Sequence, residues 1–403
     1  MPSRYLLLAF VLLLLGFPAR ARAQSEIQIS GNEYNYTFGS EITFQATLSS
    51  AVPIKEVLLI LQPEGSSATE VSQGTLYEDG LVISKYDLAA NPIRAYSRVD
   101  YWYQVTLTNG DVLTLGRDSF DYNDNRHTWQ VLNKEPFEIY WYVGDAAFGR
   151  DVLNVAQAGL QQAQSYLPVA PQGTIRIYVY DSASEVQKAL QLSGQSWIAG
   201  HADPDLGVIL VSLPEGPEQH LEMERQVPHE IMHVMLYQTY AETYSKLPVW
   251  LNEGLASVSE LYPSPDYHVL LENAYQKDAL LPIGSLCQSF PKDANGALLS
   301  YAEAAAFTRF LYDQYGTPGL ATLIDQISAG TDCERSVLLA YGTDLARLES
   351  QWKGEVFAEK PWQGALEEMT PWALLLALVL IGPLAMVIAG LGRKPAPKTA
   401  SQI

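Results

Sequence analysis

Residues 229–233 read His229-Glu230-Ile231-Met232-His233, and this stretch decides how the rest of the chain is interpreted. On a helix, side chains four residues apart lie on one face, so His229 and His233 can direct imidazole nitrogens at one metal ion. Glu230 lies beside the first histidine, where its carboxylate can take a proton from a zinc-activated water. With only six histidines in 403 residues, a chance match is improbable. The stretch therefore predicts a metal centre on a helix.

The start of that helix is predicted from its neighbours. Between Glu218 and Tyr240 the one residue that breaks helices is Pro228, and proline is best tolerated in the first turn. We therefore expect the metal helix to begin near Gln226 to Pro228. Apolar residues 234–236 continue it, as expected of a helix buried behind a metal site.

A second motif supplies a third ligand. Residues 249–257 read Val-Trp-Leu-Asn-Glu-Gly-Leu-Ala-Ser, which places Glu253 twenty positions after His233. The two motifs together resemble the gluzincin zinc metallopeptidases of the peptidase MA-like family. The spacing is similar to the thermolysin-like arrangement, and Asn-Glu-Gly is similar to the aminopeptidase N-like one. The resemblance covers roughly 137–352 and implies one Zn²⁺ per chain, held by His229, His233 and Glu253, with Glu230 as the catalytic general base.

The same resemblance extends to a tyrosine. Residues 300–303 read Ser-Tyr-Ala-Glu and lead into a helical segment, 304–312, like the tyrosine segment of aminopeptidase N-like enzymes. The resemblance implies that the Tyr301 hydroxyl stabilises the oxyanion of the tetrahedral intermediate, a role suited to a donor beside zinc. The alternative is an ordinary tyrosine near a helix cap, one of 24 in the chain.

The chain departs from aminopeptidase N-like enzymes where those enzymes hold the substrate amine. The Gly-x-Met-Glu-Asn segment of those enzymes is absent, and residues 197–201 read Trp-Ile-Ala-Gly-His at the corresponding place. This departure argues against strict aminopeptidase action. His201 either contacts substrate or is an ordinary surface histidine. The strand expected at Gly207–Ser212 is a candidate sheet edge for pairing with an extended peptide.

Ligating histidines usually donate their second N–H to a carboxylate or carbonyl group. Ser257 and Glu260 follow Glu253 by one and two helical turns, so we expect one of them to support a histidine.

The N-terminal part has the pattern of short strands. Residues 42–48 and much of 101–107 alternate apolar and polar, and Asn109-Gly110-Asp111 then gives a hairpin turn. About seven strands in 110 residues predict an antiparallel β-sandwich of the immunoglobulin or fibronectin kind at 24–136. We find no metal-ligand cluster there, so it is interpreted as a spacer or recognition module.

The pattern then changes to a mixture of helices and strands. Strands are expected at 137–142, 174–180 and 207–212, helices at 149–167 and 182–192, and mostly helical sequence continues to Trp352. The predicted class is α+β, with a mixed-sheet and helical catalytic domain at 137–352 and a linker at 353–371.

Both ends of the chain carry apolar segments. Residues 5–17 follow a basic residue and precede Ala21-Arg22-Ala23, which predicts a signal peptide over 1–23. Residues 372–391 contain no charge and are long enough to cross a bilayer, so we expect a single transmembrane helix. The basic residues that follow place the tail, 392–403, in the cytoplasm. The catalytic domain would then lie outside the cell membrane.

Charge and cysteine content agree with an exported protein. The chain has 45 acidic and 25 basic residues, a net charge of −20, and offers no basic track, which excludes nucleic-acid binding. Its two cysteines, Cys287 and Cys333, can form a disulfide in an oxidising compartment. The alternative is two buried thiols. The sequence makes no prediction of oligomeric state.

Three functions fit these observations. The first is a membrane-anchored metallopeptidase that cleaves peptide or protein substrates. The second is a surface binding or adhesion protein whose zinc site is catalytically silent, although structural zinc sites normally have four protein ligands rather than three. The third is a zinc amidase that acts on cell-wall material.

Overall fold

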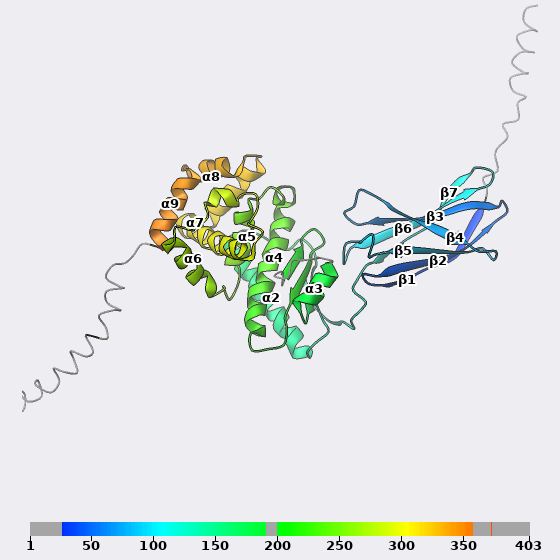
Figure 1. Cartoon of the computed structure of the whole chain (residues 1–403), viewed down its shortest axis with the longest axis horizontal. Helices are drawn as coiled ribbons and strands as arrows, with labels where there is room; N and C mark the ends of the chain where they lie inside the picture. Colours follow the sequence, from blue (N-terminus) through cyan, green and yellow to red (C-terminus); the bar gives the residue numbers. More distant parts are fainter. Residues whose placement is uncertain (1–25, 191–199, 358–371, 373–403) are drawn as a thin grey trace, which may run out of the picture.

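The computed structural model describes residues 26–190, 200–357 and Trp372. Figure 1 shows the strand-rich N-terminal part at one end of the molecule and the helices at the other. The predicted signal peptide at 1–23 and membrane helix at 372–391 lie outside the described residues, apart from Trp372. Within the described ranges, no helix is both long and apolar enough to span a bilayer.

The N-terminal part is a seven-stranded antiparallel sheet in the order β1-β2-β5-β4-β3-β6-β7. Its strands alternate buried and exposed residues, as the sequence predicted. They are β1 (Ile27–Thr37), β2 (Glu41–Ser50), β3 (Ile54–Pro63), β4 (Glu70–Leu76), β5 (Leu81–Asp87), β6 (Arg98–Leu107) and β7 (Val112–Asp121).

The two expected sheets are joined into one because β4 changes partner along its length. Its first half pairs with β3, and from Gly74 onward it pairs with β5. A Cβ at Gly74 would lie 2.9 Å from Val82 Cγ1, so only glycine fits at the crossing. The sheet then curls until its end strands meet, with the Tyr34 and Phe120 rings stacked 4.5 Å apart. The assignment to an immunoglobulin- or fibronectin-like family stays a prediction.

A second, mixed sheet has the order β11-β12-β10-β9-β8. Its strands are β8 (Gln130–Lys134), β9 (Phe137–Trp141), β10 (Ile175–Tyr180), β11 (Gly200–Asp203) and β12 (Val208–Ser212). Strand β10 runs parallel to β9 and β12, while β8 and β11 are antiparallel additions at the two sides. The predicted boundary at 136/137 falls inside the β8–β9 hairpin.

The expectation that Gly207–Ser212 forms a sheet edge is wrong. This segment is β12, which lies between β10 and β11, and all five of its residues are buried. An uninterrupted apolar run is typical of a central strand. The edge on this side of the sheet is β11, whose sequence Gly-His-Ala-Asp carries no strand signal.

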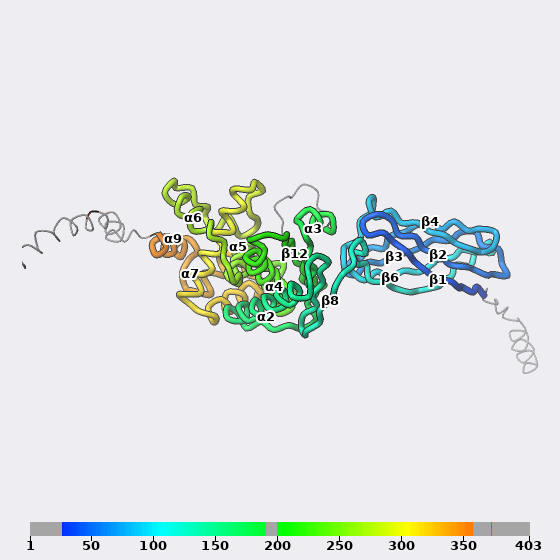
Figure 2. Tube along the Cα trace, turned by 90° about the horizontal axis from the view of Figure 1, so that it is seen from below, coloured from blue at the N-terminus to red at the C-terminus, as the bar shows by residue number. Residues whose placement is uncertain are grey.

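The helices gather around and beyond the second sheet (Figure 2). They are α2 (Ala146–Tyr166), α3 (Ala183–Leu190), α4 (Gln219–Tyr244), α5 (Val249–Val258), α6 (Asp266–Gln276), the 3₁₀ helix η1 (Ile283–Leu286), α7 (Ala294–Ser328), α8 (Cys333–Tyr341) and α9 (Leu345–Val356). Helices α2 and α4 share an apolar core with one face of the sheet. The other face shares its core with α3 and the N-terminal part.

The metal helix begins earlier than predicted. Helix α4 is continuous from Gln219, and Pro228 lies inside it. Pro228 has no N–H to donate to the Glu224 carbonyl four residues earlier, but the Leu261 N–H donates to that carbonyl instead, at 2.9 Å. The ring is accommodated because Gly159 of α2 faces it; a Cβ at Gly159 would lie 2.9 Å from Pro228 Cβ. These tertiary contacts, invisible in the local sequence, remove the need for a new start.

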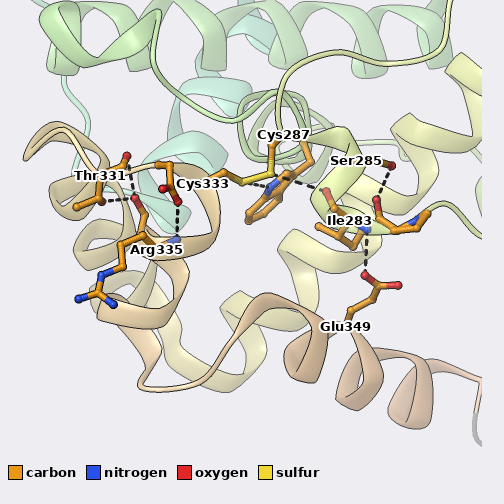
Figure 3. Close-up of a disulfide and its surroundings, with 11 residues drawn as sticks. Ile283, Ser285, Cys287, Thr331, Cys333, Arg335 and Glu349 are labelled. Carbon is orange, nitrogen blue, oxygen red and sulfur yellow. Dashed lines mark hydrogen bonds between the residues drawn. A yellow bond between two sulfur atoms is a disulfide. The ribbon is translucent and has the colours of Figure 1, made fainter.

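The expected disulfide between Cys287 and Cys333 is confirmed (Figure 3). It joins the end of η1 to the first residue of α8. The indole N–H of Trp250, on α5, donates to Cys333 Sγ at 3.4 Å. The bond therefore braces the region that holds α5, the helix carrying the third predicted ligand.

Candidate metal centre

Three predicted ligands converge from two helices. His229 and His233 come from consecutive turns of α4, and Glu253 comes from α5. Glu253 Oε2 lies 3.5 Å from His229 Nε2 and 3.6 Å from His233 Nε2, and the three ligand atoms all lie within 4.8 Å of one another. Ligands about 2.1 Å from a tetrahedral zinc ion would be about 3.4 Å apart, so the donor set fits such an ion.

Both histidines are oriented by a hydrogen bond on the opposite ring nitrogen. His229 Nδ1 lies 3.1 Å from Glu260 Oε1, and His233 Nδ1 lies 3.2 Å from Asn252 Oδ1. If each Nδ1 carries the proton and donates it, each Nε2 lone pair is left facing Glu253. This is the usual arrangement around metal-ligating histidines.

One supporting residue was predicted and one was missed. Glu260 was expected to support a histidine, and it does. Ser257 makes no hydrogen bond to either histidine within the described part of the chain. Asn252 was missed, although it immediately precedes Glu253 in the second motif, because its amide could equally have faced solvent.

The electrostatics of the site favour a cation. Burial alone raises the pKa of Glu253, but the two neighbouring histidines outweigh burial and hold that pKa well below its usual range. Burial lowers the pKa of His229, yet hydrogen bonds to Glu253 and Glu260 and the charge of Glu230 raise it well above its usual value. The carboxylates of Glu230, Glu253 and Glu260 thus surround the two imidazoles. Positive charge stabilises such a site, and a divalent ion supplies it.

Glu230 lies beside the ligands and beneath the edge strand. It is 8% exposed. A Cβ built on Gly200 of β11 would lie 2.7 Å from Glu230 Oε1, closer than a methyl group can approach. Strand β11 therefore passes directly over the predicted general base, and a glycine at 200 makes that approach feasible.

Tyr301 also lies near the ligands, but inside α7 rather than at its cap. Its ring centroid is 6.4 Å from that of His229, and Phe290 packs edge-on against it at 5.1 Å. Burial, followed by the charges of Glu253 and Glu230, raises the pKa of Tyr301 far above its usual value. The phenol therefore stays protonated at neutral pH and is available as a hydrogen-bond donor.

Close packing of α5 on α7 explains the glycine that follows Glu253. A Cβ at Gly254 would lie 2.1 Å from Thr308 Oγ1 and 2.6 Å from the backbone oxygen of Ala304. Only glycine permits this approach, so Gly254 lets α5 pack closely on α7 and thereby sets the position of Glu253. Trp250 packs edge-on against Phe307 one turn away, at 5.1 Å between centroids.

A family model described as the peptidase MA superfamily matches residues 155–358. That segment contains both histidines, Glu230, Glu253 and Tyr301. A search of curated proteins finds no match.

The chain was also compared with solved structures. An aminopeptidase N family protein from Idiomarina loihiensis is 8% identical; the match covers 83% of this chain and 71% of that one, with a TM-score of 0.31. A family 56 carbohydrate-binding module that binds β-1,3-glucan is 11% identical, over 23% of this chain and 98% of its own, with a TM-score of 0.17. The purple acid phosphatase PPD1 of yellow lupin (Lupinus luteus) is 11% identical, over 38% and 29%, with a TM-score of 0.22.

Proposed function

Because the chain belongs to the peptidase MA superfamily, we propose that it is a zinc-dependent metallopeptidase of the gluzincin type. The observation that carries this proposal is the convergence of His229, His233 and Glu253, with Glu230 beside them. Three protein ligands leave a fourth zinc position open, as in catalytic rather than structural sites.

Each residue around the site has its own role in the proposed peptide hydrolysis. When bound, the zinc ion supplies a Lewis acid that makes water more acidic and polarises the substrate carbonyl. Glu230 accepts a proton from the attacking water and returns it to the departing amine. The protonated hydroxyl of Tyr301 donates a hydrogen bond to the oxygen that gains negative charge as the carbonyl carbon becomes tetrahedral.

A peptide substrate would bind in extended form along β11. Strand β11 is an edge of the described sheet, and a chain that pairs with its free side would run about 4.8 Å from it, next to the point where β11 crosses Glu230. Pairing through the main chain accepts many sequences, so this mode suits a peptidase. The absence of a Gly-x-Met-Glu-Asn segment argues for cleavage that does not depend on a free substrate amine.

We further propose that the protein is exported and anchored in the membrane, with its catalytic domain outside. The apolar segments at 1–23 and 372–391 support this proposal, as does the Cys287–Cys333 disulfide, because disulfides persist mainly in oxidising compartments. The domain divisions at 24–136 and 137–352 and the basic tail at 392–403 belong to the same proposal. Its test is protease accessibility in intact cells; digestion of the catalytic domain only after lysis would contradict it.

The enzymatic assignment is tested by cleavage of a mixed library of quenched peptides. We expect the full-length wild type to cleave peptides, and Glu230→Gln to lose at least about 100-fold in kcat/KM while keeping its zinc. Zinc in both proteins with cleavage in neither would contradict the peptidase assignment and favour a binding protein or an amidase acting on other amides.

Tyr301→Phe tests the hydroxyl donor in the same assay. Loss of one donor to a developing oxyanion lowers kcat by about 100-fold, with KM changed little. Tyr315→Phe is the matched control, since Tyr315 lies on the same helix and is 37% exposed. Equal rates for the Tyr301→Phe variant and wild type would remove Tyr301 from the mechanism.

A further inference from the structure

The edge strand β11 is held from outside its own sheet, by an arginine of the N-terminal part. Arg94 Nη2 donates to Asp203 Oδ1 at 2.8 Å, and Arg94 Nη1 donates to Asp205 Oδ2 at 2.6 Å. Asp203 is the last residue of β11, and Asp205 follows in the turn to β12. The N-terminal part is thus hydrogen-bonded to β11, the strand that crosses Glu230, and to the turn that follows it.

The two faces of β11 look in different directions. Gly200 and Ala202 pair with Val211 and Ile209, whose side chains belong to the core shared with α4. His201 and Asp203 pair with Leu210 and Val208, which belong to the core shared with the N-terminal part. His201 Nε2 lies 3.5 Å from Asp203 Oδ1 on that second face.

A peptide strand alongside β11 would have the same alternation. Side chains level with Gly200 would point toward α4 and the metal ligands, and their neighbours would point to the opposite face. On that opposite face lies a cleft of about 330 Å³ between the N-terminal part and β11. It is lined by Pro92, Ile93, Arg94, Ala95, Ala189, Leu190, His201 and Asp203.

We propose that this cleft is a substrate subsite, built jointly by the N-terminal part, α3 and β11, for an apolar side chain of the bound peptide. The proposal rests on the peptidase function proposed above and names a specificity element of the same site. Most lining side chains are apolar. Arg94 and Asp203 are paired with each other, and His201 Nε2 lies 3.5 Å from Asp203 Oδ1, so the cleft offers apolar contact rather than an unpaired charge.

Within this subsite Arg94 is a positioning residue. Its guanidinium donates hydrogen bonds to Asp203 and Asp205 at once. This fixes the distance between β11 and the side of the cleft that Ile93 forms. Replacing Arg94 by glutamine would leave two adjacent carboxylates facing each other without a cation. The two walls would then separate, and selectivity at this one substrate position would fall.

The test profiles the full-length chain with peptides that vary from Ala to Leu at each position in turn. Loss of apolar contact in a pocket costs about tenfold in kcat/KM or more. We therefore expect the wild type to prefer Leu over Ala by about that factor at one position whose neighbours are indifferent. Ile93→Ala and Arg94→Gln should each erase this preference and leave the profile at other positions unchanged.

A binding measurement separates selectivity from catalysis. In a Glu230→Gln background, the Kd of the Leu peptide should rise about tenfold on adding Arg94→Gln, while the Kd of the Ala peptide should stay constant. Arg94→Lys should restore part of the difference. The matched control is Arg98→Gln, which removes an exposed arginine of the same domain that lies 3.6 Å from Asp100.

Two results would overturn the proposal. An unchanged profile in Arg94→Gln, or an equal loss at every position and in both peptides, would show that the N-terminal part contributes no subsite. If neither the wild type nor any variant binds or cleaves a peptide, the proposed peptidase function is wrong, and the proposed subsite is wrong as well.

Discussion

Glu260 offers a test of how the metal centre is supported from behind. Its side chain is 3% exposed, and Oε1 lies 3.1 Å from His229 Nδ1. Oε2 has no hydrogen-bond partner among the described residues. Glutamine at this position keeps the shape and an acceptor oxygen for His229, removes the negative charge, and puts an NH2 group in place of Oε2.

The size of the effect follows from that difference. Changing a group that orients a metal-ligating histidine costs about 10- to 100-fold in metal affinity. Because Glu260→Gln retains the hydrogen bond, we expect the lower end, about tenfold or 1.4 kcal/mol of zinc-binding free energy. Zinc binds more weakly because the His229 imidazole is less basic without the negative charge of Glu260.

The assay is competition for zinc against a chromophoric chelator, with circular dichroism to establish that the metal-free variant is folded. Glu272→Gln is a matched control, because its carboxylate lies 3.9 Å from His268 in an exposed pair away from the ligands. Equal zinc affinity in folded Glu260→Gln and wild type would show that the charge of Glu260 does not contribute to zinc binding. An equal loss in Glu272→Gln would show that the effect is not specific to Glu260.

Two further predictions concern Gly200 and Glu303. Gly200→Ala places a methyl group 2.7 Å from Glu230 Oε1. The flexible carboxylate must turn away, so kcat/KM should fall by about 100-fold with little change in Tm. The control Gly216→Ala, whose Cβ would have no described atom within 4 Å, should change neither kcat/KM nor Tm. Burial raises the pKa of Glu303 from 4.5 to about 7, although the Leu281 N–H donates to it. The folded state therefore holds a proton that the unfolded chain releases, and the stability present below pH 4.5 is lost as pH rises to about 7. Between about pH 5 and pH 8 the free energy of unfolding of the wild type should fall by about 2.5 kcal/mol more than that of Glu303→Gln, measured by denaturant unfolding. The same pH dependence in variant and wild type would contradict the assignment.

The local part of the site follows from sequence because helix periodicity fixes it. Residues 229 and 233 must share a face once α4 forms, and Glu230 must lie next to them. The Asn-Glu-Gly motif located the third ligand through a family resemblance, and the structure brings that carboxylate to both histidines. The alternating strands of the N-terminal part were predicted from their period of two, and three of the five strands of the second sheet, β9, β10 and β12, were predicted from their apolar residues.

The remainder depends on contacts between distant segments. The helix start at Gln219 depends on the Leu261 N–H, which satisfies the carbonyl left free by Pro228. The edge strand at 200–203 has no apolar alternation, and only its pairing with β12 makes it a strand. Nothing in the local sequence links Arg94 to β11, since an arginine in a polar loop is ordinarily solvated. The N-terminal part was therefore interpreted from sequence as a spacer or recognition module, and in the structure it contacts β11 through Arg94.

Titration of zinc into the metal-free full-length chain, with peptide cleavage followed in the same cuvette, tests whether the three-ligand site is the catalytic metal centre. The account predicts that activity rises in proportion to added zinc, reaches its plateau at one equivalent per chain, and is absent throughout the same titration of a Glu253→Ala variant. Cleavage that is independent of zinc, or that is the same after Glu253 is removed, would contradict it.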